Sequence, residues 1–267
     1  MQFHKVVRMN QPSVTSQVVA LMRAELDRPH SAAGDPDAQQ RLCQDMRLRP
    51  PDWLRPSIET RTRFVDEQVM AAIATGLRQI VICGAGYDDR GLRFRTAGVR
   101  FFELDHPSTQ ADKARLLGAE GIGATEITLA AADFGADDTG AVLARAGHDA
   151  GQPTLYICEG LLVYLDEATC RRLLAALADR AAQGSVLAAS LSLHADGLDS
   201  ADVVAAANSR RRTAAAEPWR TILPLAQYLD LLQQAGWEVA TTQRAQSAVA
   251  DVGHSRQSLL VTARRQA

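Results

Sequence analysis

Short apolar runs alternate with amphipathic segments along most of the chain. Short bounded runs are typical of buried strands, whereas apolar residues repeated every three or four positions are typical of helices. Alternation of the two builds a mostly parallel sheet with helices on both faces. We therefore predict a doubly wound α/β fold whose last strand pair gives the seven-stranded sheet an antiparallel edge. The predicted strands are 79–83, 100–104, 126–132, 154–158, 185–191, 237–241 and 258–263.

Helical patterns dominate the chain before the first predicted strand, so we expect an N-terminal helical cap. Val65, Val69 and Ile73 recur on one helical face, and Gly76 follows where a left-handed C-terminal residue belongs. Further helices are expected at 108–117, from a capping Asp166 to 182, and at 225–235.

Composition narrows the class of protein. The formal net charge is −2 and no basic stripe is present, so nucleic acid is not an expected partner. No apolar run is long enough to span a membrane, and the first residues lack the apolar core of a signal peptide. We expect a cytoplasmic enzyme. The four cysteines lack paired metal-ligand spacing, which favours structural thiols and no metal site.

The most informative segment is the first predicted strand with its glycines, Gly84 and Gly86. A second apolar run ends at Asp105, an acid that can accept hydrogen bonds from ribose hydroxyls. This pattern predicts a nucleoside-binding crevice. A dinucleotide site would need a third glycine, but Asp89 stands there, preceded by Asp88. Two carboxylates would repel a pyrophosphate and tolerate a cation, which favours S-adenosylmethionine over NAD.

Four motifs in order resemble a known family. They are Arg61-Thr-Arg-Phe-Val-Asp, the glycine segment at 79–90, Phe102-Glu-Leu-Asp-His-Pro with Lys113 downstream, and Glu159-Gly-Leu-Leu-Val-Tyr-Leu. Together they resemble leucine carboxyl methyltransferase-like enzymes, whose bacterial branch includes O-methyltransferases of polyketide biosynthesis. The resemblance implies the class I, Rossmann-like methyltransferase fold and S-adenosyl-L-methionine as cofactor.

A single domain over 1–267 is expected from this resemblance. Its parts are the helical cap (1–78), the cofactor-binding core (79–193), a substrate-lid insertion (194–224), and a C-terminal helix and strand pair (225–267).

The resemblance also assigns residues to the cofactor. Arg61 matches the basic residue that pairs with the methionine carboxylate, with Arg63 as the alternative. Asp105 matches the ribose-binding acid, and Glu103 lies on the same face of the strand as its competitor. Gly84 and Gly86 correspond to the glycines under the methionine portion. Asp133 and Phe134 match the pair that contacts adenine. The alternative is that they form a surface turn. Glu159 would face the positive end of the cofactor.

Other positions are open between a functional and a structural role. Tyr164 either faces the substrate or packs in the core, and His194 either acts as general base or is structural. His106 and Lys113 are assigned packing roles. Asp89 replaces the usual threonine of the glycine motif. The arginines at 210–212 either recognise an acidic acceptor or form a solvated helix face, and the second reading is favoured.

The predicted activity is methyl transfer to an oxygen of a small molecule, in bacterial secondary metabolism. A carboxylate acceptor is already ionised near neutral pH, whereas a phenol needs a base such as His194. The absence of a clear base favours a carboxylate. An NAD-dependent oxidoreductase or a catalytically silent binding protein on the same fold are the alternatives, and the sequence indicates no oligomeric state.

Overall fold

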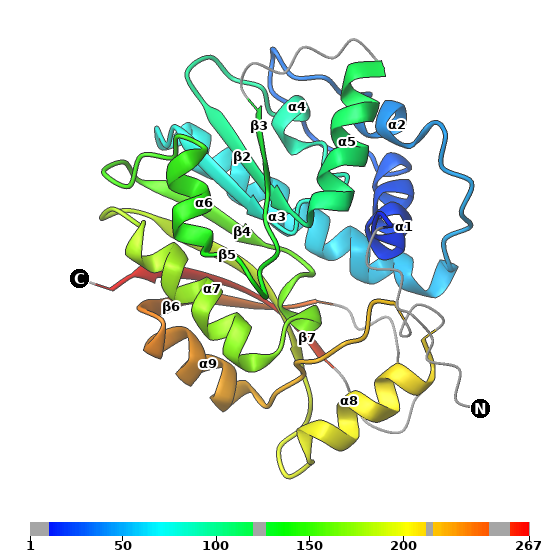
Figure 1. Ribbon diagram of the computed structural model, residues 1–267, viewed down its shortest axis with the longest axis vertical. Helices are drawn as coiled ribbons and strands as arrows, with labels where there is room; N and C mark the ends of the chain where they lie inside the picture. Colours follow the sequence, from blue (N-terminus) through cyan, green and yellow to red (C-terminus); the bar gives the residue numbers. More distant parts are fainter. Residues whose placement is uncertain (1–10, 120–126, 212–215, 246–256, 267) are drawn as a thin grey trace.

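A twisted central sheet organises the chain (Figure 1). The computed structural model describes residues 11–119, 127–211, 216–245 and 257–266. Within them seven strands pair in the order β3-β2-β1-β4-β5-β7-β6. They are β1 (Gln79–Cys83), β2 (Arg100–Asp105), β3 (Ile127–Ala131), β4 (Thr154–Cys158), β5 (Val186–Leu193), β6 (Trp237–Ala245) and β7 (Gln257–Arg265).

The strand directions confirm the predicted mixed sheet. The neighbours from β3 to β5 all pair in parallel, and β7 pairs antiparallel with both β5 and β6. Because β7 inserts between β5 and β6, the outermost strand is β6. β5 runs to Leu193, two residues beyond the prediction, since it pairs with β7 along its whole length. Residue 126, the predicted start of the third strand, lies outside the described residues.

Helices cover both faces of the sheet. Within the described residues they are α1 (Val14–Ala24), α2 (Ala38–Cys43), α3 (Arg55–Ala74), α4 (Arg90–Arg93), α5 (Pro107–Ala119), α6 (Thr139–Arg145), α7 (Glu167–Asp179), α8 (Ser200–Ser209) and α9 (Leu225–Gln234). Two short 3₁₀ helices accompany them, η1 (Asp52–Leu54) and η2 (Leu162–Tyr164). The predicted N-cap of α7 is present: the side chain of Asp166 accepts a hydrogen bond from Thr169 N at 2.8 Å.

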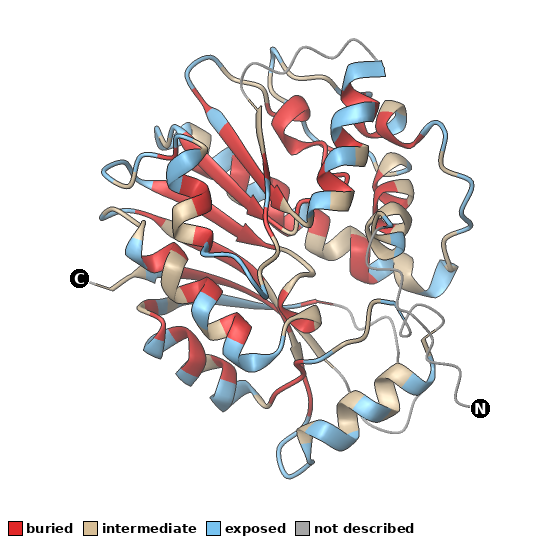
Figure 2. Ribbon diagram, viewed as in Figure 1, coloured by how far each residue is buried: buried red, intermediate tan, exposed pale blue. Residues whose placement is uncertain are grey.

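The core has two layers because side chains alternate across each strand. On β1, Val81 and Cys83 face α6, α7 and α9, whereas Ile80 and Ile82 face α3. Burial on both sides explains why the central strands read as continuous apolar runs (Figure 2). The N-terminal helices α1 and α2 pack with α5 in a third cluster beside the sheet.

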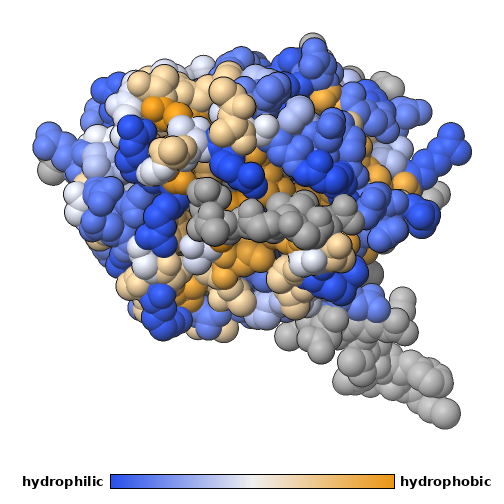
Figure 3. Space-filling model, turned by 90° about the horizontal axis from the view of Figure 1, so that it is seen from above, coloured by the Kyte–Doolittle hydropathy of each residue, from blue (hydrophilic) through white to orange (hydrophobic). Residues whose placement is uncertain are grey.

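The face of the molecule seen in Figure 3 is mostly hydrophilic, and hydrophilic side chains surround a smaller hydrophobic area there. In the described part of the chain, no helix combines the length and the hydropathy needed to cross a bilayer. The helix α8 contributes no buried residue and stands away from the sheet (Figure 1).

Candidate functional site

A cavity of about 1690 Å³ opens at the carboxyl ends of the parallel strands. The chain reverses its direction of winding between β1 and β4, and crevices of doubly wound sheets form at such a point. Seven of the predicted site residues line the cavity: Arg61, Gly84, Asp105, Asp133, Phe134, Glu159 and Tyr164. Gly86 and His194 are not among the lining residues.

The loop after β1 is held by backbone bonds. Gly84 N and Ala85 N both donate to Leu104 O, at 2.8 and 3.0 Å. Gly84 and Gly86 have φ of +67° and +52°, in the left-handed region that favours glycine. A Cβ on Gly86 would lie 2.6 Å from the Cβ of Ser16 on α1. Gly86 therefore allows α1 to pack against the loop, and its place under the cofactor stays a prediction.

Replacing Gly86 with alanine should separate strain from crowding. Gly86→Ala forces the left-handed conformation, at about 1–2 kcal/mol, and also the clash with Ser16. Gly98→Ala is the matched control, because Gly98 has φ +76° but open space around its Cβ position. We expect Gly86→Ala to lower the melting temperature further than Gly98→Ala. Equal losses in thermal unfolding would show that the contact with α1 does not constrain the loop.

Asp105 ends β2 and lines the cavity. Its Oδ2 accepts from Gly86 N and its Oδ1 from His106 N, both at 2.7 Å. Burial raises its pKa, although these two N–H groups oppose the shift. A carboxylate has about four lone-pair sites, so both oxygens can still accept bonds from a ligand.

The competitor Glu103 is fully buried beneath the site. Its carboxylate forms an ion pair with Lys113, whose Nζ also donates to Asp88 O at 2.6 Å. Burial raises the pKa of Glu103 to about 7, and Lys113 only partly offsets this. The structure thus leaves Asp105, not Glu103, within reach of a ligand, and gives Lys113 a buried ion pair as well as its predicted packing role.

Glu159 lies at the end of β4 among three guanidinium groups. It pairs with Arg23 Nη2 at 2.6 Å, and with Arg61 Nε and Arg90 Nη1, both at 2.9 Å. Burial acts to raise the pKa of Glu159, but Arg23, Arg90 and Arg61 outweigh it and bring it to about 2. The carboxylate therefore serves to hold these arginines, in addition to lining the cavity.

Arg61 and Arg23 both line the cavity, and Arg61 is the more exposed of the two. Its side chain is 18% exposed, against 6% for Arg23 and 0% for Arg90. Only its Nε bonds Glu159; within the described residues its two terminal nitrogens make no hydrogen bond. Arg63, the alternative, points to the surface and pairs with Glu59 one turn away. The terminal nitrogens of Arg61 can therefore receive a carboxylate.

Asp88 and Asp89 do not act as the free carboxylates that were expected to repel a pyrophosphate. Asp88 pairs with Arg90 and Arg23 at 2.5 and 3.1 Å, and Asp89 is likewise paired with Arg28 and Arg93, both at 2.7 Å. These cations outweigh burial and hold the pKa of both carboxyls below their usual range. Their charges are thus neutralised locally and do not repel a phosphate across the cavity.

Asp88 works against a pyrophosphate in a different way. Its Oδ1 accepts from Arg90 N, the first N–H of α4, at 2.8 Å. Asp105 takes the N–H of Gly86. A pyrophosphate in a dinucleotide fold binds N–H groups at this loop and helix start. Here the protein's own carboxylates already occupy them.

Asp133 and Phe134 follow β3 at the far side of the cavity. Asp133 Oδ1 accepts from Gly135 N at 2.9 Å, which shapes a tight turn. Both residues are half-buried and line the cavity, as does Tyr164 of η2. The turn and the lining position coexist, so the two predicted readings of Asp133 are compatible.

His194 does not line the cavity, and its role as a base stays a prediction that its ring contacts disfavour. Its ring is 5% exposed and lies between Ala195 O and Ser200 Oγ, each at 2.8 Å from a ring nitrogen. Nδ1 must donate to the carbonyl, so Nε2 accepts from the serine hydroxyl. With both nitrogens engaged away from the cavity, His194 holds the start of α8.

Two groups of cavity residues were not predicted from the sequence. Arg23 of α1 reaches Asp88 and Glu159, 65 and 136 positions away, and no local pattern indicates such pairs. The other is the wall made by Arg211 and Trp219. The guanidinium of Arg211 lies 4.2 Å from the centre of the Trp219 ring, so at least this arginine is not part of a solvated face. Arg210 is exposed, and Arg212 lies outside the described residues.

The chain matches known proteins over much of its length. Residues 11–178 match the family model described as leucine carboxyl methyltransferase. A Streptomyces coelicolor protein is 42% identical over 131 residues, covering 48% of this chain and 46% of the relative. A Frankia alni protein is 40% identical over 137 residues, covering 50% and 48%. Both are named "Putative S-adenosyl-L-methionine-dependent methyltransferase". This chain therefore spans about half the length of these relatives.

Solved structures share the fold. A "putative methyltransferase" from Thermobifida fusca YX superposes with a TM-score of 0.60 at 16% identity, covering 98% of this chain and 97% of the other. Magnesium protoporphyrin IX methyltransferase from Synechocystis, with bound SAH, gives 0.53 at 15% identity, covering 86% and 94%. The predicted class I methyltransferase fold is confirmed.

Proposed function

Because the chain belongs to the leucine carboxyl methyltransferase family, we propose that it is an S-adenosyl-L-methionine-dependent methyltransferase acting on an oxygen of a small molecule. The observation that carries this proposal is the pairing of two groups across one cavity. Arg61 on α3 presents two terminal guanidinium nitrogens that bond no residue of the described ranges, and Asp105 presents a carboxylate at the end of β2. One suits an amino-acid carboxylate and the other suits ribose hydroxyls.

The residues present fit this cofactor. Gly84 lies at the cavity without a side chain, so a ligand can approach the backbone there. Asp133 and Phe134 would meet the adenine beyond β3, and Glu159 keeps Arg61 oriented. S-adenosyl-L-methionine supplies an electrophilic methyl group that an acceptor oxygen can take without a further co-reactant.

The acceptor oxygen is that of a carboxylate or a phenol. A carboxylate needs no base, because it is ionised near neutral pH. Both ring nitrogens of His194 have protein partners and His194 does not line the cavity, which supports a carboxylate further. The proposal extends to a cytoplasmic role in bacterial secondary metabolism, such as polyketide tailoring, on the strength of the motif resemblance.

The main rival is an NAD-dependent oxidoreductase on a similar sheet. It is disfavoured because Asp88 and Asp105 occupy N–H groups that a pyrophosphate would bind. Calorimetric titration should give heat with S-adenosyl-L-methionine and none with NAD⁺; the reverse pattern would overturn the proposal. Incubation with the methyl donor and a panel of aromatic carboxylic acids and phenols, read by mass spectrometry, then distinguishes an enzyme from a silent binding protein.

Replacing Arg61 tests the carboxylate contact. Arg61→Met should weaken S-adenosyl-L-methionine binding roughly tenfold or more, because a charge-assisted pair is lost. Methylthioadenosine, which lacks the amino-acid carboxylate, should bind both proteins equally. Arg63→Met, on the outer face of the same helix, should change neither affinity. If Arg61→Met weakens both ligands to the same degree, the side chain supports the site without contacting the carboxylate.

A further inference from the structure

The cavity is larger than one ligand requires. Its volume of about 1690 Å³ exceeds the roughly 300–1,000 Å³ of a usual small-molecule site. The residues proposed to hold the cofactor come chiefly from the strand ends. The outer part is lined instead by η1, η2, α8 and residues 216–220. We call this outer part the acceptor chamber, and its lining indicates what it binds.

One wall of the acceptor chamber is an ordered stack. The guanidinium of Arg211 lies 4.2 Å from the ring centre of Trp219 and 5.5 Å from that of Tyr164. Arg211 Nη1 also donates to Glu217 O at 2.9 Å. The side chain of Asn208 clamps Trp219, accepting from its N–H at 2.9 Å and donating to its carbonyl at 2.8 Å. The wall therefore consists of a cation in contact with two aromatic rings.

The segment that carries this wall is tied to the rest of the protein at both ends. Glu217 accepts from Val14 N at 2.8 Å and Thr15 N at 3.0 Å, at the start of α1. A parallel bridge between Leu193 and Leu223 closes the base of the insertion. These contacts fix the chamber wall against α1 and β5, so the chamber exists before a ligand enters.

Hydrogen-bond donors in the chamber favour an anion. Four carboxylates line it. Asp166 caps α7, Asp199 caps α8 and Glu217 caps α1, so their oxygens already accept backbone N–H groups, whereas Asp202 is exposed on α8. The side chains of Arg210 and Arg220 also line the chamber, and neither makes a hydrogen bond or ion pair with a residue that the structure describes. The arginines thus offer donors that the carboxylates do not consume.

An exposed aromatic completes the chamber. Trp53 of η1 lines the cavity with 55% of its surface exposed, and Leu198 on the insertion is 37% exposed. Apolar and aromatic side chains are the usual lining of small-molecule sites. Together with Tyr164 they provide flat apolar contact area for a ring.

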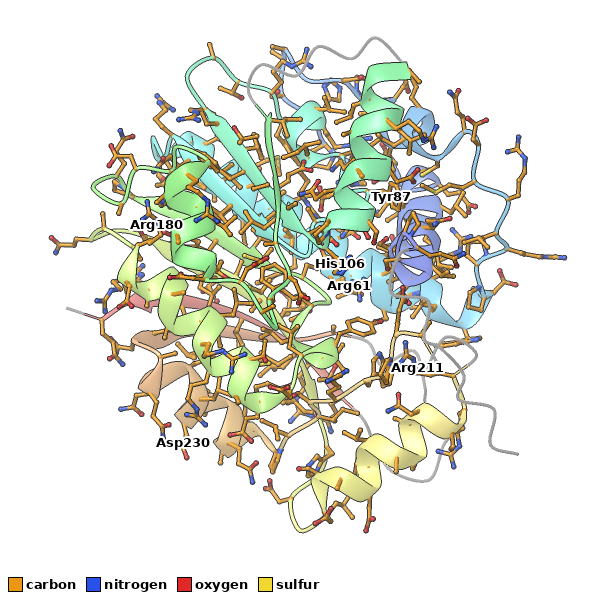
Figure 4. The ribbon with its side chains drawn as sticks, in the orientation of Figure 1. Arg61, Tyr87, His106, Arg180, Arg211 and Asp230 are labelled. Atoms are coloured by element: carbon orange, nitrogen blue, oxygen red, sulfur yellow. The ribbon has the colours of Figure 1, made fainter. Side chains whose placement is uncertain are left out.

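We propose that the acceptor chamber binds a flat aromatic anion, with the ring along Trp53 and Tyr164 and the anionic group held by Arg211 and its neighbours Arg210 and Arg220. This inference rests on the proposed function in that the bound anion is taken as the methyl acceptor. Figure 4 shows Arg211 near α8 and Arg61 on the core side of the cavity. The part of the ligand held by Arg211 is therefore not the part that receives the methyl group, which must face the strand ends.

The test compares three ligands that share a naphthalene ring and carry a negative charge, no charge or a positive charge. Dissociation constants of 2-naphthoate, 2-naphthamide and 2-naphthylmethylammonium are measured by tryptophan fluorescence, with and without S-adenosylhomocysteine. We expect naphthoate to bind roughly tenfold or more tightly than the amide, and the cation to bind weakest. Arg211→Met should reduce the preference for the anion to less than about threefold, whereas Arg63→Met should leave it intact.

Two further variants keep the test decisive if Arg211→Met disturbs the wall. The double variant Arg210→Met and Arg220→Met alters only exposed side chains and should also reduce the preference for the anion. Trp53→Ala should weaken all three ligands by a similar factor without changing their order. Equal affinity for the three ligands, or a preference unchanged in all arginine variants, overturns the proposal.

The outcome is separable from the proposed function. A protein that prefers naphthoate but gives no heat with S-adenosyl-L-methionine retains the chamber and loses the methyltransferase assignment. A protein that binds the cofactor and methylates a neutral acceptor, with no preference for naphthoate, retains the function and loses the chamber.

Discussion

Replacing Asp66 by asparagine is expected to lower the free energy of unfolding by roughly 3–5 kcal/mol, because it breaks a buried ion pair. Asp66 is 1% exposed on α3. Its two oxygens accept from Arg28 Nη2 and Nε at 3.0 and 2.8 Å, and Oδ1 also accepts from Arg90 Nε at 2.7 Å. Asparagine has nearly the same shape but turns one acceptor into a donor. That donor would face guanidinium N–H groups in a buried site.

The same helix offers the control. Glu59 pairs with Arg63 on the exposed side of α3, with side chains 39% and 49% exposed. Glu59→Gln should cost between zero and about 1 kcal/mol, since exposed pairs contribute little. Urea unfolding of both variants at neutral pH measures the difference. Similar small losses for the two would mean that water or local rearrangement satisfies the buried arginines around Asp66.

The large effect follows from what the buried charges connect. Arg28 lies beyond α1, Asp66 on α3, and Arg90 at the start of α4; Arg90 continues to Glu159 at the end of β4. The chain of ion pairs therefore joins the N-terminal helices to the strand ends that line the cavity. A hydrophobic core would hold these elements together equally well. Charged groups also fix the angle at which Arg61 meets the cavity, through Glu159.

The elements of the sheet were predictable because the signal is local. β1 and β4 are buried on both faces, so they read as uninterrupted apolar runs, and the predicted limits match the structure. The position of Asp105 at the carboxyl end of β2 was predictable from the strand period. Strand length at the distal edge was not, because β6 is exposed along most of its length and its extension follows from pairing with β7.

The partners of polar groups were not predictable from residue type and position. The carboxylates of Asp88 and Asp89 look free in the sequence. Arginines two and four positions later, and others about sixty positions earlier, neutralise them. His194 looks like a lone catalytic histidine, but its neighbours Ala195 and Ser200 occupy its ring. A residue type at a plausible position does not show whether its polar atoms are already engaged. That depends on packing between elements.

Replacing Asp105 by alanine is expected to weaken S-adenosyl-L-methionine binding on the order of a hundredfold. Hydrogen bonds to a charged group contribute about 1.5–3 kcal/mol each, and each 1.4 kcal/mol is tenfold in affinity. Asp105→Ala also releases Gly86 N and His106 N, which loosens the loop that carries Gly84. Asp105→Asn keeps one acceptor oxygen, so its loss should be intermediate, about tenfold.

Titration calorimetry of the two variants, with melting temperatures measured in parallel, separates the contributions of Asp105. Asp230→Ala is the control, because Asp230 is exposed on α9 and lies far from the cavity (Figure 4). If cofactor affinity falls only in variants whose melting temperature also falls, Asp105 shapes the loop without contacting ribose. If Asp105→Ala binds as tightly as the native protein, the ligand lies elsewhere in the cavity. An intermediate affinity for Asp105→Asn at a native melting temperature would indicate direct contact, because the fold is then intact although one acceptor oxygen has become a donor.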